Sequence, residues 1–176
     1  MQLRVASRMR GDFVVEGITM ELELIKTFVE YHLDMTHRVW DSIDQITEEQ
    51  FLADDAYSRG SIRNLMVHLA ATDRRWPVGM KNLPDIGLLN FEDYPTRAEA
   101  RQLFEQVAND LREYTNSLTA EELAQNPIDL VYPRWQVFLH IINHGTDHRS
   151  TVLQRLHEFG APTFDQDFIM WLWNRK

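Results

Sequence analysis

The sequence predicts an all-α fold, a four-helix bundle with short accessory turns. Apolar residues recur at helical spacing in four long segments, and helix-capping patterns precede several of them. Strand signals are sparse and are limited to Phe13-Val14-Val15 and to residues 129–132. Amphipathic helices of this kind bury their apolar stripes against one another, which is the arrangement of a bundle.

The first bundle helix is expected to follow Thr19, a suitable N-cap residue, and to run to about Ile46. Residues 1–19 are then an N-terminal arm, and residues 20–176 form the bundle domain. Residues 47–50, Thr-Glu-Glu-Gln, have the capping-box pattern of a short helical turn. A second helix is expected after Gly60-Ser61, and Pro77 is expected to kink or stop it.

Residues 81–95 contain Pro84, Gly87 and Pro95 and are expected to form a connector. Capping boxes at residues 96–99 and 119–122 predict the third helix and a further short turn. The fourth helix is expected to begin at Pro133, since proline suits the first helical position. It is expected to end at Gly160, because glycine is the favoured residue just past a helix end.

The composition indicates a globular chain of single-domain length, with 176 residues, 44% hydrophobic and 26% charged. No apolar run is long enough to cross a bilayer, and the N-terminal residues lack the apolar segment of a secretory signal. We therefore expect a cytoplasmic protein with no membrane partner. The formal net charge of −9 argues against nucleic acid as a ligand, because phosphate contacts need clustered Lys and Arg.

The chain has no cysteine, which excludes disulfides, thiolate metal ligands and a cysteine nucleophile. Any thiol chemistry therefore requires a thiol that arrives with a substrate. The sequence also lacks a Gly-rich phosphate loop, a Gly-x-Ser-x-Gly elbow and a His-Glu-x-x-His motif. The zincin mechanism, with a glutamate beside the first ligand, is excluded.

The most informative segment is residues 136–160, which carries His140, His144 and His148 at four-residue spacing. In a helix, side chains at this spacing lie on one face. Relative to His144, His140 falls at about −40° and His148 at about +40°, on the apolar side of the helix. Arg149 falls near 140° and points away from that position. His144 and His148 are therefore candidate ligands of one divalent ion.

A third ligand must come from another helix, and His68 on the second helix is the candidate. Three imidazoles leave a position open for water or substrate, as in catalytic metal sites. Zinc, nickel, copper and iron(II) all accept neutral imidazole, and we expect zinc or nickel. The alternative is that these histidines are core residues that bind no metal.

The catalytic residues cannot be assigned from the sequence, and Asp147, His140 and His32 are candidates for proton transfer. Asp147 lies at the edge of the apolar stripe, and His140 lies one turn before the ligand pair, where a pocket position is favoured over a ligand position. His32 belongs to the inward stripe of the first helix and is expected to line the pocket. His157, near a helix end, is expected to be a solvent-facing residue.

Residues 139–172, LHIINHGTDHRSTVLQRLHEFGAPTFDQDFIMWL, closely resemble the fourth-helix signature of the DinB-like (YfiT-type) metalloenzyme family. Residues 61–76, SIRNLMVHLAATDRRW, resemble its second-helix signature, and the resemblance covers about residues 20–173. It implies that His68, His144 and His148 are the metal triad of an up–down–down–up bundle that is often dimeric. Family members often have Arg-Gly-Gln after the last ligand, where this chain has Arg149-Ser150-Thr151.

Relatives of this family include thiol transferases that use a low-molecular-weight thiol and a maleylpyruvate isomerase. The resemblance therefore implies a metal-dependent transferase of the thiol S-transferase type that acts on a small molecule. A metal-dependent hydrolase and a non-enzymatic metal-binding or small-molecule-binding protein are the alternatives. We also expect a homodimer, because aromatic residues such as Trp171 and Trp173 exceed what a small bundle needs for its own core.

Overall fold

The computed structural model describes the backbone of residues 6–175 and the side chains of residues 20–175. The predicted all-α fold is confirmed, and no strand occurs within this range. Four long helices form the bundle: α1 (Ala6–Ile43), α3 (Ile62–Met80), α4 (Arg97–Ser117) and α6 (Arg134–Glu158). The short elements are α2 (Glu48–Leu52), the 3₁₀ helix η1 (Phe91–Asp93), α5 (Ala120–Ala124) and α7 (Phe168–Asn174).

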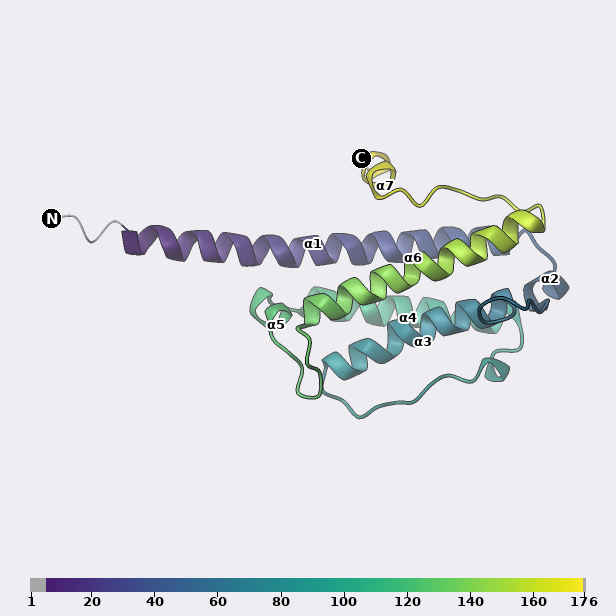
Figure 1. Cartoon of the computed structure of the whole chain (residues 1–176), viewed down its shortest axis with the longest axis horizontal. Coiled ribbons are helices and arrows are strands. Elements are labelled where there is room, and N and C mark those ends of the chain that lie inside the picture. Colours follow the sequence, from purple (N-terminus) through teal and green to yellow (C-terminus); the bar gives the residue numbers. More distant parts are fainter. Residues whose placement is uncertain (1–5, 176) are drawn as a thin grey trace.

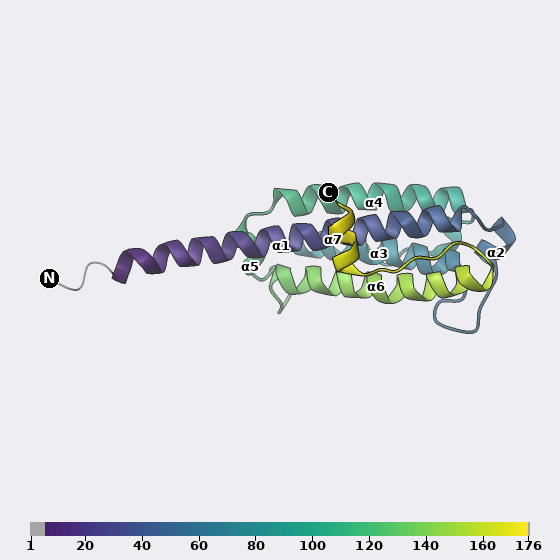
Figure 2. The same cartoon turned by 90° about the horizontal axis from the view of Figure 1, so that it is seen from above.

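In the bundle, α1 and α3 each pack against both α4 and α6 (Figures 1 and 2). The connector after α3 returns along the outside of the bundle, so that α3 and α4 run in the same direction (Figure 1). The helices enclose one apolar core, and among its largest buried side chains are Trp40, Phe51, Phe104 and Phe138. Because α3 and α6 are neighbours, side chains on their facing stripes can meet.

The first helix is longer than predicted, because it begins at Ala6 and not after Thr19. No proline interrupts residues 6–19, and the cost of Gly11 and Gly17, about 1 kcal/mol each in a helix interior, does not break the helix. Phe13-Val14-Val15, which has a β-like composition, therefore lies within a helix. Residues 1–5 of the predicted arm lie outside the described residues.

The predicted capping boxes are confirmed at Thr47, Thr96 and Thr119, where each side chain accepts a hydrogen bond from the third residue of its helix. Pro77 does not end α3, which continues to Met80, because a proline in the last turn removes only one hydrogen bond of the helix. Pro133 is the N-cap of α6 and not its first helical residue, a difference of one position. Gly160 follows the C-cap residue with a left-handed φ of 78°, as expected for a glycine there.

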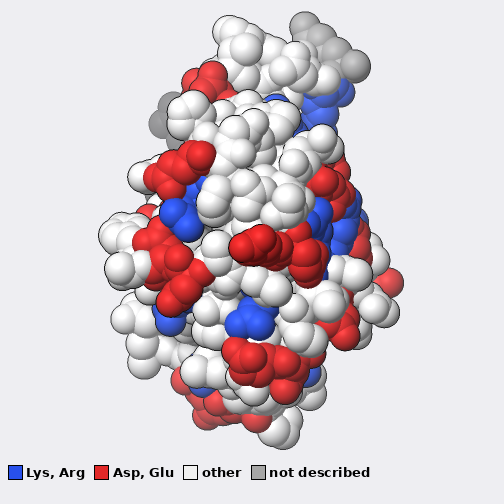
Figure 3. Space-filling model, turned by 90° about the vertical axis from the view of Figure 1, so that its right-hand side faces the viewer, with Lys and Arg blue, Asp and Glu red and all other residues white. Residues whose placement is uncertain are grey.

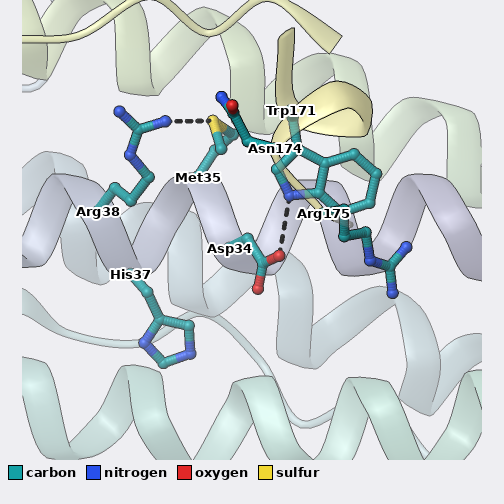
Figure 4. A pocket seen from close by; sticks show the side chains of 7 residues that line it. All are labelled: Asp34, Met35, His37, Arg38, Trp171, Asn174 and Arg175. Carbon is teal, nitrogen blue, oxygen red and sulfur yellow. Dashed lines mark hydrogen bonds between the residues drawn. The ribbon is translucent and has the colours of Figure 1, made fainter. Parts of the chain in front are cut away.

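The C-terminal segment crosses back over α1, and α7 packs against that helix (Figure 2). Trp171, one of the two tryptophans behind the dimer prediction, is buried within its own chain and packs edge-to-face on Tyr31. Its Nε1 donates to Asp34 Oδ2 at 2.9 Å, beside an open cavity of about 560 Å³ (Figure 4). Trp173 is 60% exposed, so that only this tryptophan of the pair is available to a partner.

Acidic and basic side chains alternate on the surface of the bundle end that carries α2 (Figure 3). Several of these charges are paired across helices, as in the ion pairs of Arg101 with Asp41 and Asp44. No continuous basic area covers the face shown in Figure 3. In the part of the chain that the structure describes, no helix is long and apolar enough to cross a bilayer.

Candidate metal centre

The three histidines predicted as ligands come together between α3 and α6. The Nε2 atoms of His68 and His144 lie 3.1 Å apart, and the ring of His148 lies 4.3 Å from that of His144 and 4.9 Å from that of His68, centroid to centroid. One ligand nitrogen from each residue lies within 4.8 Å of the other two. The spacing of four residues on α6 and the packing of α3 against α6 produce this convergence.

The donor set fits a divalent metal ion. Two nitrogen ligands bound about 2.1 Å from a tetrahedral ion lie roughly 3.4 Å apart, close to the observed 3.1 Å between the Nε2 atoms of His68 and His144. The Nδ1 atoms of His144 and His148 are buried and have no hydrogen-bond partner within residues 20–175. Three half-buried imidazoles with few hydrogen bonds of their own are more consistent with ligands than with satisfied core histidines.

Electrostatics keep the three imidazoles neutral, which is the form that binds a metal. Burial, together with the charge of Arg59 and the neighbouring His148, lowers the pKa of His68 to about 4. Burial and the neighbouring histidines lower the pKa of His144 to about 3. Burial also lowers the pKa of His148, although Asp147 acts in the opposite direction. All three imidazoles are therefore uncharged at neutral pH even without a bound ion.

The centre borders a surface cavity of about 460 Å³ along α6, which is lined by His140, Asn143, His144, Thr146, Asp147 and Ser150. His140 and Asp147 are both exposed, and the ring of His140 lies 5.2 Å from that of Trp76 and 5.6 Å from that of His144. On the α3 side, Thr72 Oγ1 lies 3.5 Å from His144 Nε2. The cavity therefore brings two predicted proton-transfer candidates, His140 and Asp147, next to a ligand.

His32 does not line this cavity, contrary to the expectation that it faces the pocket. It is fully buried, and both of its ring nitrogens have partners, Asp73 Oδ2 at 2.8 Å and Arg149 Nη1 at 2.8 Å. His32 does face the bundle interior, as its place on the apolar stripe of α1 predicts. However, α6 packs over its ring and separates it from the cavity. The Cβ position of Gly145 lies 2.3 Å from the His32 ring.

Asp73 and Arg149 are buried charged residues that the sequence did not indicate as important. Arg149 is fully buried, and Asp73 is 1% exposed. The helical wheel directs Arg149 away from the candidate ligands, but it does not reveal that α1 covers that side of α6. The sequence shows only that Arg149 directly follows the candidate ligand His148 and that Asp73 is five positions after the candidate ligand His68.

The fold and the site together define the class of this protein, an all-α bundle with a three-histidine cluster suited to a divalent metal. The family model named DinB family matches residues 20–174, nearly the whole chain. The chain therefore belongs to the DinB family, as the resemblance of its second and fourth helices indicated. None of the curated proteins compared with the chain matches it.

Proposed function

We propose that His68, His144 and His148 bind one divalent metal ion, zinc or nickel, and that the protein is a metal-dependent transferase of the thiol S-transferase type. The observation that carries the metal proposal is the 3.1 Å approach of the His68 and His144 Nε2 atoms, with burial keeping both rings neutral. Family membership supports the same assignment.

A bound divalent ion lowers the pKa of a coordinated thiol or water and so supplies a nucleophile at neutral pH. The chain has no cysteine, so the thiol must be a low-molecular-weight co-substrate. In the transfer, the thiol sulfur forms a bond to an electrophilic carbon, and a leaving group departs with the electron pair of the bond that breaks. Asp147 and His140 border the cavity beside His144 and are the candidates to accept the thiol proton.

Metal content is the first test of this proposal. Protein loaded with zinc or nickel and then freed of excess ion is expected to retain about one ion per chain, because three imidazoles form one site. The His144→Ala variant, prepared in the same way, is expected to retain none. Wild-type protein without stoichiometric metal would support the alternative that the three histidines are core residues.

Activity on defined substrates is the second test. We expect metal-loaded protein to accelerate the reaction of free cysteine with 1-chloro-2,4-dinitrobenzene, in which a carbon–sulfur bond forms and chloride leaves. Hydrolysis of p-nitrophenyl acetate tests the competing hydrolase. A protein that binds metal stoichiometrically but catalyses neither reaction would favour the non-enzymatic binding alternative.

We also propose that the protein is a homodimer. The outer face of α7 carries three exposed apolar side chains, Ile169, Met170 and Trp173. Together with the aromatic packing of Trp171 beneath them, they give α7 an apolar surface of the kind that commonly marks an interface.

A further inference from the structure

A buried polar network lies on the inner side of the candidate metal centre. His32 on α1 connects Asp73 on α3 with Arg149 on α6 through two hydrogen bonds of 2.8 Å. Arg149 also donates to the backbone oxygen of His32 at 3.3 Å and to Thr36 Oγ1 at 3.2 Å. None of the three central side chains is more than 1% exposed, so the network is sealed from solvent.

The hydrogen-bond donors around His32 determine which of its ring nitrogens carries the proton. Arg149 has only N–H donors, so His32 Nδ1 must accept, and the ring proton is on Nε2, which donates to Asp73 Oδ2. His32 is therefore a neutral connector between a carboxylate and a guanidinium. Burial lowers the pKa of Arg149 to about 10, so the guanidinium remains charged at neutral pH.

Two members of the network, Asp73 and Arg149, are each linked to a proposed ligand by a short stretch of helix. Asp73 is five positions after His68 on α3, and Arg149 directly follows His148 on α6. The network therefore joins the two ligand-bearing helices through α1, near the level at which the imidazoles converge. A shift of α3 or α6 along its axis would break the hydrogen bonds to His32.

Gly145, the residue after ligand His144, makes this contact between α1 and α6 possible. A Cβ atom at position 145 would lie 2.3 Å from the His32 ring and 2.8 Å from Arg149 Nη1, and both side chains are held by hydrogen bonds. Real Cβ atoms essentially never come this close to another heavy atom. Glycine therefore lets His32 pack directly on the helix between the ligands His144 and His148.

We propose that His32, Asp73 and Arg149 are positioning residues that hold α3 and α6 in the relative placement that brings the three ligand nitrogens together. This role rests on the proposed metal centre. Stability alone does not explain such a network, because well-packed apolar residues often replace buried ion pairs without loss of stability. One carboxylate oxygen, Asp73 Oδ1, is also buried with no hydrogen-bond partner among residues 20–175.

The test compares metal affinity with fold stability. His32→Phe keeps a ring of similar size but removes both hydrogen bonds, and Leu111→Ala removes core volume from α4, which carries no ligand. Each protein is first shown to be folded by circular dichroism, and its stability is measured by urea unfolding. Zinc affinity is then measured by competition with a chromophoric chelator, and the visible spectrum of the cobalt(II) form reports the coordination geometry.

We expect His32→Phe to weaken zinc binding about tenfold or more and to shift the cobalt bands, as loss of supporting partners around metal ligands commonly does. Leu111→Ala is expected to lower stability but to keep wild-type zinc affinity and the wild-type spectrum. Wild-type affinity and spectrum in His32→Phe would overturn the proposal, and so would an equal loss of affinity in Leu111→Ala. A wild-type protein that binds no metal would instead overturn the metal centre itself.

The double variant Asp73→Asn/Arg149→Met provides a second measurement should His32→Phe not fold. It removes both charges together, so neither is left buried without its partner. Weaker zinc binding in this folded variant would support the positioning role, and unchanged binding would overturn it. Failure of both variants to fold would make the network a requirement of the fold and would also overturn the proposal.

Discussion

His68 and His144 are 76 positions apart in the chain, yet their Nε2 atoms lie 3.1 Å from each other between α3 and α6. Their helices are packed by apolar stripes that need no ion. The fold alone therefore brings the candidate ligands together. We expect that loss of the metal would leave the bundle folded.

Replacement of a ligand is expected to remove metal without unfolding the protein. His144→Ala should lose stoichiometric zinc or nickel while its circular dichroism spectrum stays helical, because the apolar core is independent of the ion. His68→Ala and His148→Ala should behave alike. His157→Ala, an exposed control on the same helix as two of the ligands, should keep full metal content. Full metal content in all four variants would contradict the triad.

His140→Ala is expected to give an intermediate result. The His140 ring is 5.6 Å from that of His144 but is absent from the group of converging ligand nitrogens. A residue that supports a ligand typically contributes about 10–100-fold in metal affinity, whereas loss of a ligand costs far more. Competition titration with zinc distinguishes these cases, and complete loss of binding would make His140 a ligand.

Acidification is expected to destabilise the metal-free protein. The pKa of His68 is about 4 and that of His144 about 3 in the folded chain, both below the ordinary histidine pKa of 6.5. Between these values and 6.5 the unfolded chain binds more protons, so stability falls as the pH decreases through this window and is fully present above it. Urea unfolding with chelator at pH 7.5 and pH 5 measures the loss.

The triple variant His68→Ala/His144→Ala/His148→Ala is the control for this pH dependence. It should lose less stability between pH 7.5 and pH 5 than the wild type, because the three groups with lowered pKa are gone. An equal loss in both proteins would assign the pH dependence to other groups.

The oligomeric state is expected to depend on Trp173. Light scattering should give the wild type twice the 20.8 kDa mass of one chain, and Trp173→Asp should give a monomer. Tyr57→Asp, which alters an equally prominent exposed aromatic residue outside α7, is the matched control and should stay dimeric. A monomeric wild type at micromolar concentration would reject the dimer.

Local signals in the sequence were sufficient for the capped helix starts and for the shared face of His144 and His148. The capping boxes at Thr47, Thr96 and Thr119 mark helix starts through contacts within four residues, and the four-residue spacing of His144 and His148 defines a shared face. These features depend on local geometry alone, which explains why they could be predicted.

The buried network could not be predicted, because its members lie on three helices. A helical wheel gives the direction of Arg149 relative to its own helix but not the identity of the neighbour on that side. Only the packing of α1 against α6 shows that Arg149 meets His32 there. The early start of α1 was missed for a different reason: Thr19 resembles an N-cap residue, but the chain before it contains no helix-breaking proline.

The order of the helices along the chain also determines when the proposed metal could be bound. One ligand lies on α3, and the other two lie on α6, after α4 and α5. A nascent chain therefore offers only one of the three proposed ligands, His68, until α6 has been synthesised and has docked. At the proposed centre the ion would enter a bundle that is already built, so it would act as a late addition and not as a folding nucleus. Protein synthesised under metal starvation is accordingly expected to accumulate as a folded, loadable form.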